Sequence, residues 1–138
     1  MLSKIRKINL KKAGLCSVAV GCANIIIHIL AIAQVIPYLW INGGRSVSYE
    51  AARDSFFSSI IITIVNIIIA MVASQIIPLK LNRIVGILLS VFLIATLPLS
   101  FIGIVMQLMG TQFEKCVMSI IVAVGFVADI RIAFEKRW

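Results

Sequence analysis

Four long apolar stretches occupy most of this chain and leave little polar sequence between them. They cover residues 13–39, 56–77, 84–109 and 116–134. A helix needs about 20 mostly apolar residues to cross a hydrocarbon core of about 30 Å, and each stretch is close to that length or longer. We therefore predict an all-α integral membrane protein, built as a four-helix transmembrane bundle.

The composition supports this prediction and favours a single domain. Of the 138 residues, 62% are hydrophobic and only 13% are charged, which is far from the balance of a water-soluble domain. The connections at residues 78–83 and 110–115 are too short to hold a second fold. We expect one four-pass domain over residues 1–138.

The basic residues predict which side of the membrane each end of the bundle faces, because Lys and Arg are retained on the cytoplasmic side during insertion. Of the 13 basic residues, only Arg45, Arg53 and Lys115 lie on the side opposite the termini. The other ten are Lys4, Arg6, Lys7, Lys11, Lys12, Lys80, Arg83, Arg131, Lys136 and Arg137. Both termini are therefore predicted to be cytoplasmic.

The net charge of +8 also indicates the expected partners. Basic residues near a membrane surface attract anionic lipid headgroups by about 1 kcal/mol each. We expect membrane lipids at the cytoplasmic face, and the helix faces also allow a membrane-protein partner or a homo-oligomer. No aromatic and basic recognition module accompanies the charge, so we expect no nucleic acid. We interpret the location as the bacterial plasma membrane.

The sequence shows no pattern typical of catalysis or metal binding. It lacks a convincing pair of nucleophile and base, and it lacks paired carboxylates within the apolar stretches. The cysteines at positions 16, 22 and 116 do not have the spacing of metal ligands. We therefore expect no enzyme activity, no cofactor and no metal site.

Small and polar residues form a seam on each of the first three spans. Their spacing alternates between three and four residues, which places each set on one face of a helix. Such faces allow close helix packing and hydrogen bonding between helices. The seams are Ser17, Gly21, Asn24, His28 and Ala31; Ser59, Thr63, Asn66, Ala70 and Ala73; and Thr96, Ser100, Gly103, Gln107 and Gly110.

The seams have a structural and a functional interpretation. In the first, polar side chains join the helices, and His28 contacts Asn66, directly or through water, because both lie near the centres of their predicted spans. In the second, the polar side chains line an intramembrane cavity that takes a ligand. The candidate ligand-binding residues are Asn24, His28, Gln34, Thr63, Asn66, Ser100 and Gln107.

Asp129, near the end of the fourth span, also has two interpretations. It forms a partly solvated ion pair with Arg131 at the membrane boundary, or it faces the bundle and binds a cation or relays protons, as intramembrane acids often do. The helix phase does not choose between them. Pro37 is expected to help end the first helix.

The longest connection combines a turn signal with charged residues. The Asn-Gly-Gly sequence at residues 42–44 favours left-handed backbone, and Ser48 is expected to cap a helix that begins at Tyr49. The nearby charges form a cluster for an entrance or a partner, or they form weak, solvated ion pairs. The candidate interaction residues of this outer loop are Arg45, Glu50, Arg53 and Asp54.

Two functions follow from these observations. The leading hypothesis is a small multi-pass membrane protein that binds or transports an amphipathic or lipid-like small molecule in an intramembrane polar cavity. The alternative is an accessory or immunity-like membrane protein that acts through helix–helix and outer-loop contacts. In the alternative, the seams are packing surfaces and no cavity is required.

Overall fold

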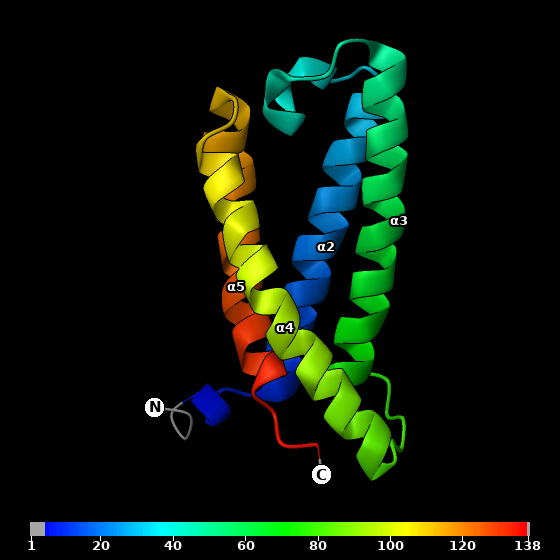
Figure 1. Ribbon diagram of the computed structural model, residues 1–138, viewed down its shortest axis with the longest axis vertical. Coiled ribbons are helices and arrows are strands. Elements are labelled where there is room, and N and C mark those ends of the chain that lie inside the picture. The colour runs from blue at the N-terminus through cyan, green and yellow to red at the C-terminus, as the bar shows by residue number, and fades with distance from the viewer. Residues whose placement is uncertain (1–4, 138) are drawn as a thin grey trace.

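The computed structural model describes residues 5–137, so the basic residue Lys4 lies outside it. The fold is all-helical, with four helices that are long and apolar enough to cross a membrane. They are α2 (Leu10–Ile32), α3 (Tyr49–Ala73), α4 (Arg83–Leu108) and α5 (Ser119–Ala133), the last preceded by a π-helical turn, η3 (Glu114–Met118). The described chain starts and ends at the same end of the bundle (Figure 1); which side of a membrane that end faces stays a prediction.

Side-chain caps define the start of three of these helices. The Asn9, Ser48 and Asn82 side chains each accept a hydrogen bond from a backbone N–H three residues further on. Such caps satisfy amide groups that have no partner inside the helix. The predicted cap at Ser48 is confirmed.

The first helix ends seven residues earlier than predicted, at Ile32. The chain reverses at Gln34, whose φ is +56°, and the N–H groups of Val35 and Ile36 both donate to the Leu30 carbonyl. This left-handed turn uses up the last carbonyls of the helix. Pro37 lies beyond it, so the prediction that Pro37 ends the helix is wrong.

Helix α3 ends by the same device. Gln75 has a φ of +58°, and the N–H groups of the next two residues donate to the Met71 carbonyl. The two helix ends also share sequence: Asn-Ile-Ile-Ile at positions 24–27 and 66–69 is followed by Gln-Val-Ile-Pro at 34–37 and Gln-Ile-Ile-Pro at 75–78. A repeated local sequence thus forms a repeated local structure.

The four helices form two pairs that diverge from the terminal end of the bundle. Helix α2 packs along α3 and along α5, and α4 packs along α5. Helix α4 approaches α3 only near the terminal end, where Leu89 and Leu93 pack against a core that includes Ala70 and Ala73. Figure 1 shows α4 running diagonally from the lower end of α3 to a position beside α5, with the connection after α2 lying across the opposite end.

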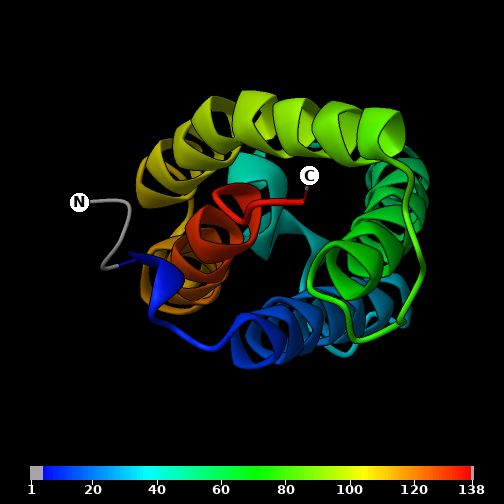
Figure 2. The ribbon, with the colours of Figure 1, turned by 90° about the horizontal axis from the view of Figure 1, so that it is seen from below.

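Two arginines hold the terminal end together. Arg131 is buried, and it forms an ion pair of 2.6 Å with Glu135 and donates to the carbonyls of Arg6 and Ile8. Arg137 donates to Ser90 on α4 and to the last carbonyls of α3 and α5, at Ala73 and Ile132. Burial lowers the pKa of Arg137. The negative charge of Glu135 acts against this shift, and the positive charge of Arg131 adds to it. The C-terminal tail runs inward across the bundle (Figure 2).

Glu114 holds the opposite end. It is 3% exposed, and its carboxylate accepts hydrogen bonds of 3.0 Å from the Gly43 N–H and 2.8 Å from the Thr111 N–H. The Thr111 hydroxyl in turn donates to the Trp40 carbonyl. The outer loop is therefore docked on the turn between α4 and α5.

This docking predicts the effect of removing the carboxylate. We expect Glu114→Ala to lower the free energy of unfolding by about 2 kcal/mol, because two partly buried N–H groups lose a charged acceptor. Titration of the folded protein with sodium dodecyl sulfate, followed by circular dichroism, measures this. The neighbouring exposed Lys115→Ala serves as the control, and equal stability of the two variants would contradict the prediction.

Candidate functional site

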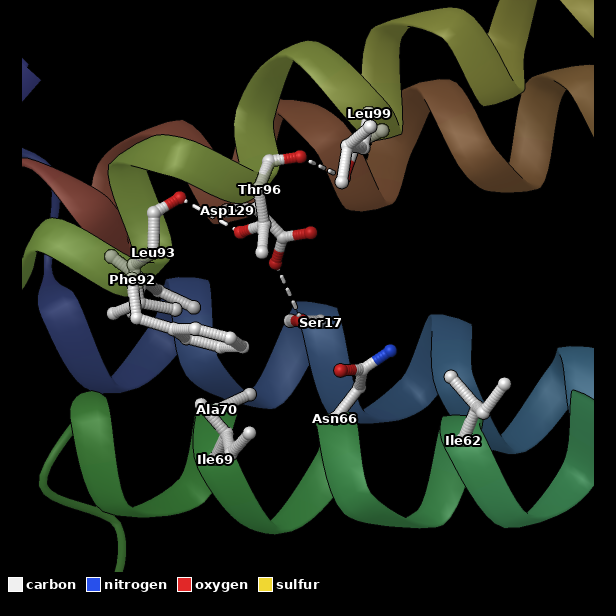
Figure 3. Close-up of a pocket in the computed structure, with 12 residues that line it drawn as sticks. Ser17, Ile62, Asn66, Ile69, Ala70, Phe92, Leu93, Thr96, Leu99 and Asp129 are labelled. Atoms are coloured by element: carbon white, nitrogen blue, oxygen red, sulfur yellow. Dashed lines mark hydrogen bonds between the residues drawn. The ribbon is translucent and has the colours of Figure 1, made fainter. Parts of the chain in front are cut away.

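Two adjoining cavities lie between the four helices. Their volumes are about 450 and 210 Å³, and Ser17, Asn66, Ser100 and Asp129 line both. These four residues come from α2, α3, α4 and α5, so each long helix contributes one. We call the two together the polar cavity. Figure 3 shows Asp129, Ser17 and Asn66 around its centre.

Asp129 faces the interior of the bundle. One oxygen of its carboxylate accepts a hydrogen bond of 2.8 Å from the Ser17 hydroxyl. Arg131 follows two residues later, on another face of α5, and its guanidinium contacts Glu135. The interpretation of Asp129 as the ion-pair partner of Arg131 is therefore wrong.

Several hydroxyl groups at the cavity donate hydrogen bonds to backbone carbonyls of their own helices. Thr96 donates to the Leu93 carbonyl over 2.8 Å, and Ser100 donates to the Thr96 carbonyl over 3.2 Å. Thr63 donates to the Ser59 carbonyl and accepts from the Asn24 amide. The oxygen lone pairs of Thr96 and Ser100 thus remain available to a ligand as acceptors.

The polar cavity opens sideways between α3 and α4. Ile62 on α3 is 61% exposed, and Phe92 and Leu99 on α4 are 47% and 67% exposed, although all three line the larger cavity. In a bilayer this opening faces the hydrocarbon.

Comparisons of the chain with protein-family models, curated proteins and solved structures find no match.

Four of the seven candidate ligand-binding residues lie at the polar cavity: Asn24, Thr63, Asn66 and Ser100. They come from three different helices, as the alignment of seams indicates. The cavity also takes in Ser17 and Thr96, which the sequence placed on the seams but not among the candidates. Asp129 and Gly103 also line the cavity, and neither was among the seven candidates.

His28 is not among the residues that line the cavity. It is buried, its Nδ1–H donates to the Asn24 carbonyl of its own helix over 2.8 Å, and its ring packs edge-on against Phe56. The midpoint of α2 is near Gly21, where a β-carbon would meet Ile67, the neighbour of Asn66. His28 thus lies two turns from the level of Asn66, and the predicted contact does not form.

The remaining candidates lie near the loop end of the bundle. Gln34 is exposed in the turn after α2, outside the helix where the sequence placed it. Gln107 lines a separate pocket of about 270 Å³ together with Glu114 and Arg45, and its side-chain oxygen is buried without a hydrogen-bond partner among the described residues. Neither residue contributes to the polar cavity.

The charged residues of the outer loop are dispersed. The Arg53 Nε and Asp54 Oδ1 atoms lie 3.8 Å apart, and both side chains are exposed. Glu50 is exposed in the first turn of α3, while Arg45 borders the pocket of Gln107. Exposed ion pairs of this kind contribute little to stability.

Proposed function

We propose that this protein binds an amphipathic or lipid-like small molecule in the polar cavity, and that the molecule enters between α3 and α4. The observation that carries this proposal is the combination of polar and apolar lining. A carboxylate, an amide and hydroxyl groups lie at the centre, and exposed apolar side chains form the opening. The volume of about 450 Å³ falls in the range typical of small-molecule sites, about 300–1,000 Å³.

The hydrogen bonding of the seams supports a ligand site over simple helix packing. Polar side chains that only joined helices would be paired with one another, because an unpaired polar group in hydrocarbon is costly. Ser17 pairs with Asp129 and Asn24 pairs with Thr63. Asn66 is exposed at the cavity, and no side-chain hydrogen bond of it is found within residues 5–137. A bound molecule would supply its partner.

Transport is the extension of this proposal. Helix α4 packs along α5 and approaches α3 only at the terminal end, so movement of α4 would change the opening while leaving the α2–α3 pair intact. A molecule held at the centre would then be released toward one membrane face or the other. Flux of a bound molecule through vesicles that contain only this protein tests the extension.

Gly103 offers a way to fill the cavity without disturbing the fold. It lines the smaller cavity, and a β-carbon built on it meets nothing within 4 Å. We expect Gly103→Phe to occupy the ligand space, and replacing a helical glycine with phenylalanine also raises the helix propensity of α4 by roughly 0.5 kcal/mol. Native mass spectrometry of protein released from membranes should show small-molecule adducts on the unmodified protein and about a tenfold lower fraction on this variant.

The matched control is Ala19→Phe, which adds the same ring to an exposed position on α2 away from the cavity. Its adducts should equal those of the unmodified protein. Equal adducts on Gly103→Phe would show that the molecules bind elsewhere. Absence of adducts from all three proteins, with no binding of added amphipathic molecules, would favour the accessory role through the outer loop.

A further inference from the structure

We infer that the ligand of the polar cavity carries a protonated amine, and that Asp129 is the residue that binds it. This inference rests on the proposed function, and it adds the chemical class of the ligand's head. It follows from three properties of the cavity: the sign of its charge, the hydrogen-bonding character of its polar atoms, and its size.

The charge at the cavity has one sign. Asp129 is the ionisable residue among those that line the two cavities, and no lysine or arginine of the described chain joins it there. The two arginines nearest in sequence are engaged elsewhere, Arg131 with Glu135 and Arg137 with the ends of α3 and α5. A carboxylate in hydrocarbon without a cation is costly, so a cationic ligand is the partner that the site lacks.

The polar atoms around Asp129 are mainly hydrogen-bond acceptors. The Thr96 and Ser100 hydroxyls have donated to backbone carbonyls of α4, which leaves their oxygens directed to other partners. The Ser17 hydroxyl has donated to the carboxylate itself. An ammonium group is a donor of three hydrogen bonds with no acceptor, and this is the complement of such a site.

The size and the apolar wall favour an organic ammonium over a bare metal cation. Phe92 extends from α4 toward Ala70 on α3 and forms one wall beside Asp129 (Figure 3). A cavity of about 450 Å³ is much larger than the close shell of oxygens that a small hard cation requires. An alkyl chain attached to the ammonium would fill this space and leave through the opening between α3 and α4.

Three probes with the same chain test the inference: nonylammonium, nonanol and nonanoate. Binding of each radiolabelled probe to the protein in lipid nanodiscs is measured, and binding to empty nanodiscs is subtracted. We expect nonylammonium to bind about tenfold or more tightly than nonanol, since a charge-assisted hydrogen bond is roughly twice as strong as a neutral one, and nonanoate to bind most weakly. Asp129→Asn keeps the shape and the acceptor for Ser17, and it should bring the affinities for nonylammonium and nonanol together.

Asp54→Asn makes the same change at an exposed position far from the cavity and should retain the preference. Equal affinities of nonylammonium and nonanol in the unmodified protein, with both lost in Gly103→Phe, would overturn the inference and keep the proposed function. Binding of no probe above empty nanodiscs would overturn both. Displacement of nonylammonium by sodium, but not by the bulky cation N-methylglucamine, would assign Asp129 to an alkali ion instead. The comparison of probes on the unmodified protein decides the inference even if Asp129→Asn fails to fold.

Discussion

Replacing Gly14 with alanine should lower the free energy of unfolding by about 2–3 kcal/mol, because α2 crosses the end of α3 with no space for a β-carbon. A β-carbon at Gly14 would lie 2.0 Å from the Ser74 hydroxyl oxygen and 2.3 Å from the Ser74 β-carbon. Ser74 cannot move aside easily: it is fully buried, it caps α3, and its hydroxyl donates to the Ala70 carbonyl over 2.6 Å. Forcing extra volume into such a contact costs about 1–3 kcal/mol, and separation of the helix ends adds to this.

A compensating change gives this prediction its sharpest test. Ser74→Gly removes the two closest of the three atoms that the new β-carbon meets and leaves only the Ile76 Cδ1 at 3.0 Å, so the double variant should recover most of the stability that Gly14→Ala loses. Gly103→Ala is the control, because its β-carbon meets nothing. The free energy of unfolding in sodium dodecyl sulfate is measured for the unmodified protein, Gly14→Ala, the double variant and Gly103→Ala. If the double variant were no more stable than Gly14→Ala alone, the close crossing of α2 and α3 would not be the cause.

The helices themselves follow from local signals in the sequence. The apolar stretches give their number, and the caps at Asn9, Ser48 and Asn82 are residues whose short side chains reach the first free N–H groups of a helix. The ends are harder, because hydropathy continues past them. Residues 33–39 are apolar enough to continue the first span, yet the backbone turns at Gln34. Glutamine is not the residue expected at a left-handed position.

The repeated sequence is the signal that could have located both helix ends. Gln34 and Gln75 occupy the same place in the two copies of Gln-x-Ile-Pro, and both have a left-handed backbone. Proline three residues later cannot continue a helix. The error at the first end had a consequence, because it moved the predicted centre of α2 toward His28 and produced the incorrect pairing with Asn66.

The polar cavity could be predicted only in part, for a geometric reason. Residues that join helices and residues that line a cavity have the same spacing of three and four, so the seams on α2, α3 and α4 identify Asn24, Asn66 and Ser100 without giving their role. The role depends on whether a neighbouring helix fills the space beside the seam. Whether the Asp129 side chain faces the cavity depends on the rotation of α5 about its own axis. Close contacts such as Gly125 against Val20 set this rotation, and the hydropathy of the sequence does not predict it.

Because α4 diverges from α3, we expect the stability of the bundle to depend strongly on Arg137 at the end where the two helices meet. Its guanidinium joins Ser90 on α4 to the final carbonyls of α3 and α5, and these carbonyls carry the negative end of the helix dipoles. Gly86 allows this approach, since a β-carbon there would lie 2.8 Å from the Arg137 carbonyl oxygen. Arg137→Ala should therefore lower the free energy of unfolding by about 2–3 kcal/mol, as expected for lost hydrogen bonds to a charged group.

The effect should also be local, because the hydrogen bonds of Arg137 join the start of α4 to both neighbouring helices, beside the packing of Leu89 and Leu93. Hydrogen exchange should accelerate in the first three turns of α4 and at the end of α3, and remain unchanged in the middle of α2. Arg137→Lys keeps the charge but loses the planar fork that reaches acceptors on α3, α4 and α5, so its exchange should be intermediate. Lys136→Ala, at the exposed neighbouring position, should behave like the unmodified protein. Uniform acceleration along all four helices would contradict a role in holding α4. Acceleration confined to these segments would show that Arg137 holds the terminal end of α4 against α3 and α5.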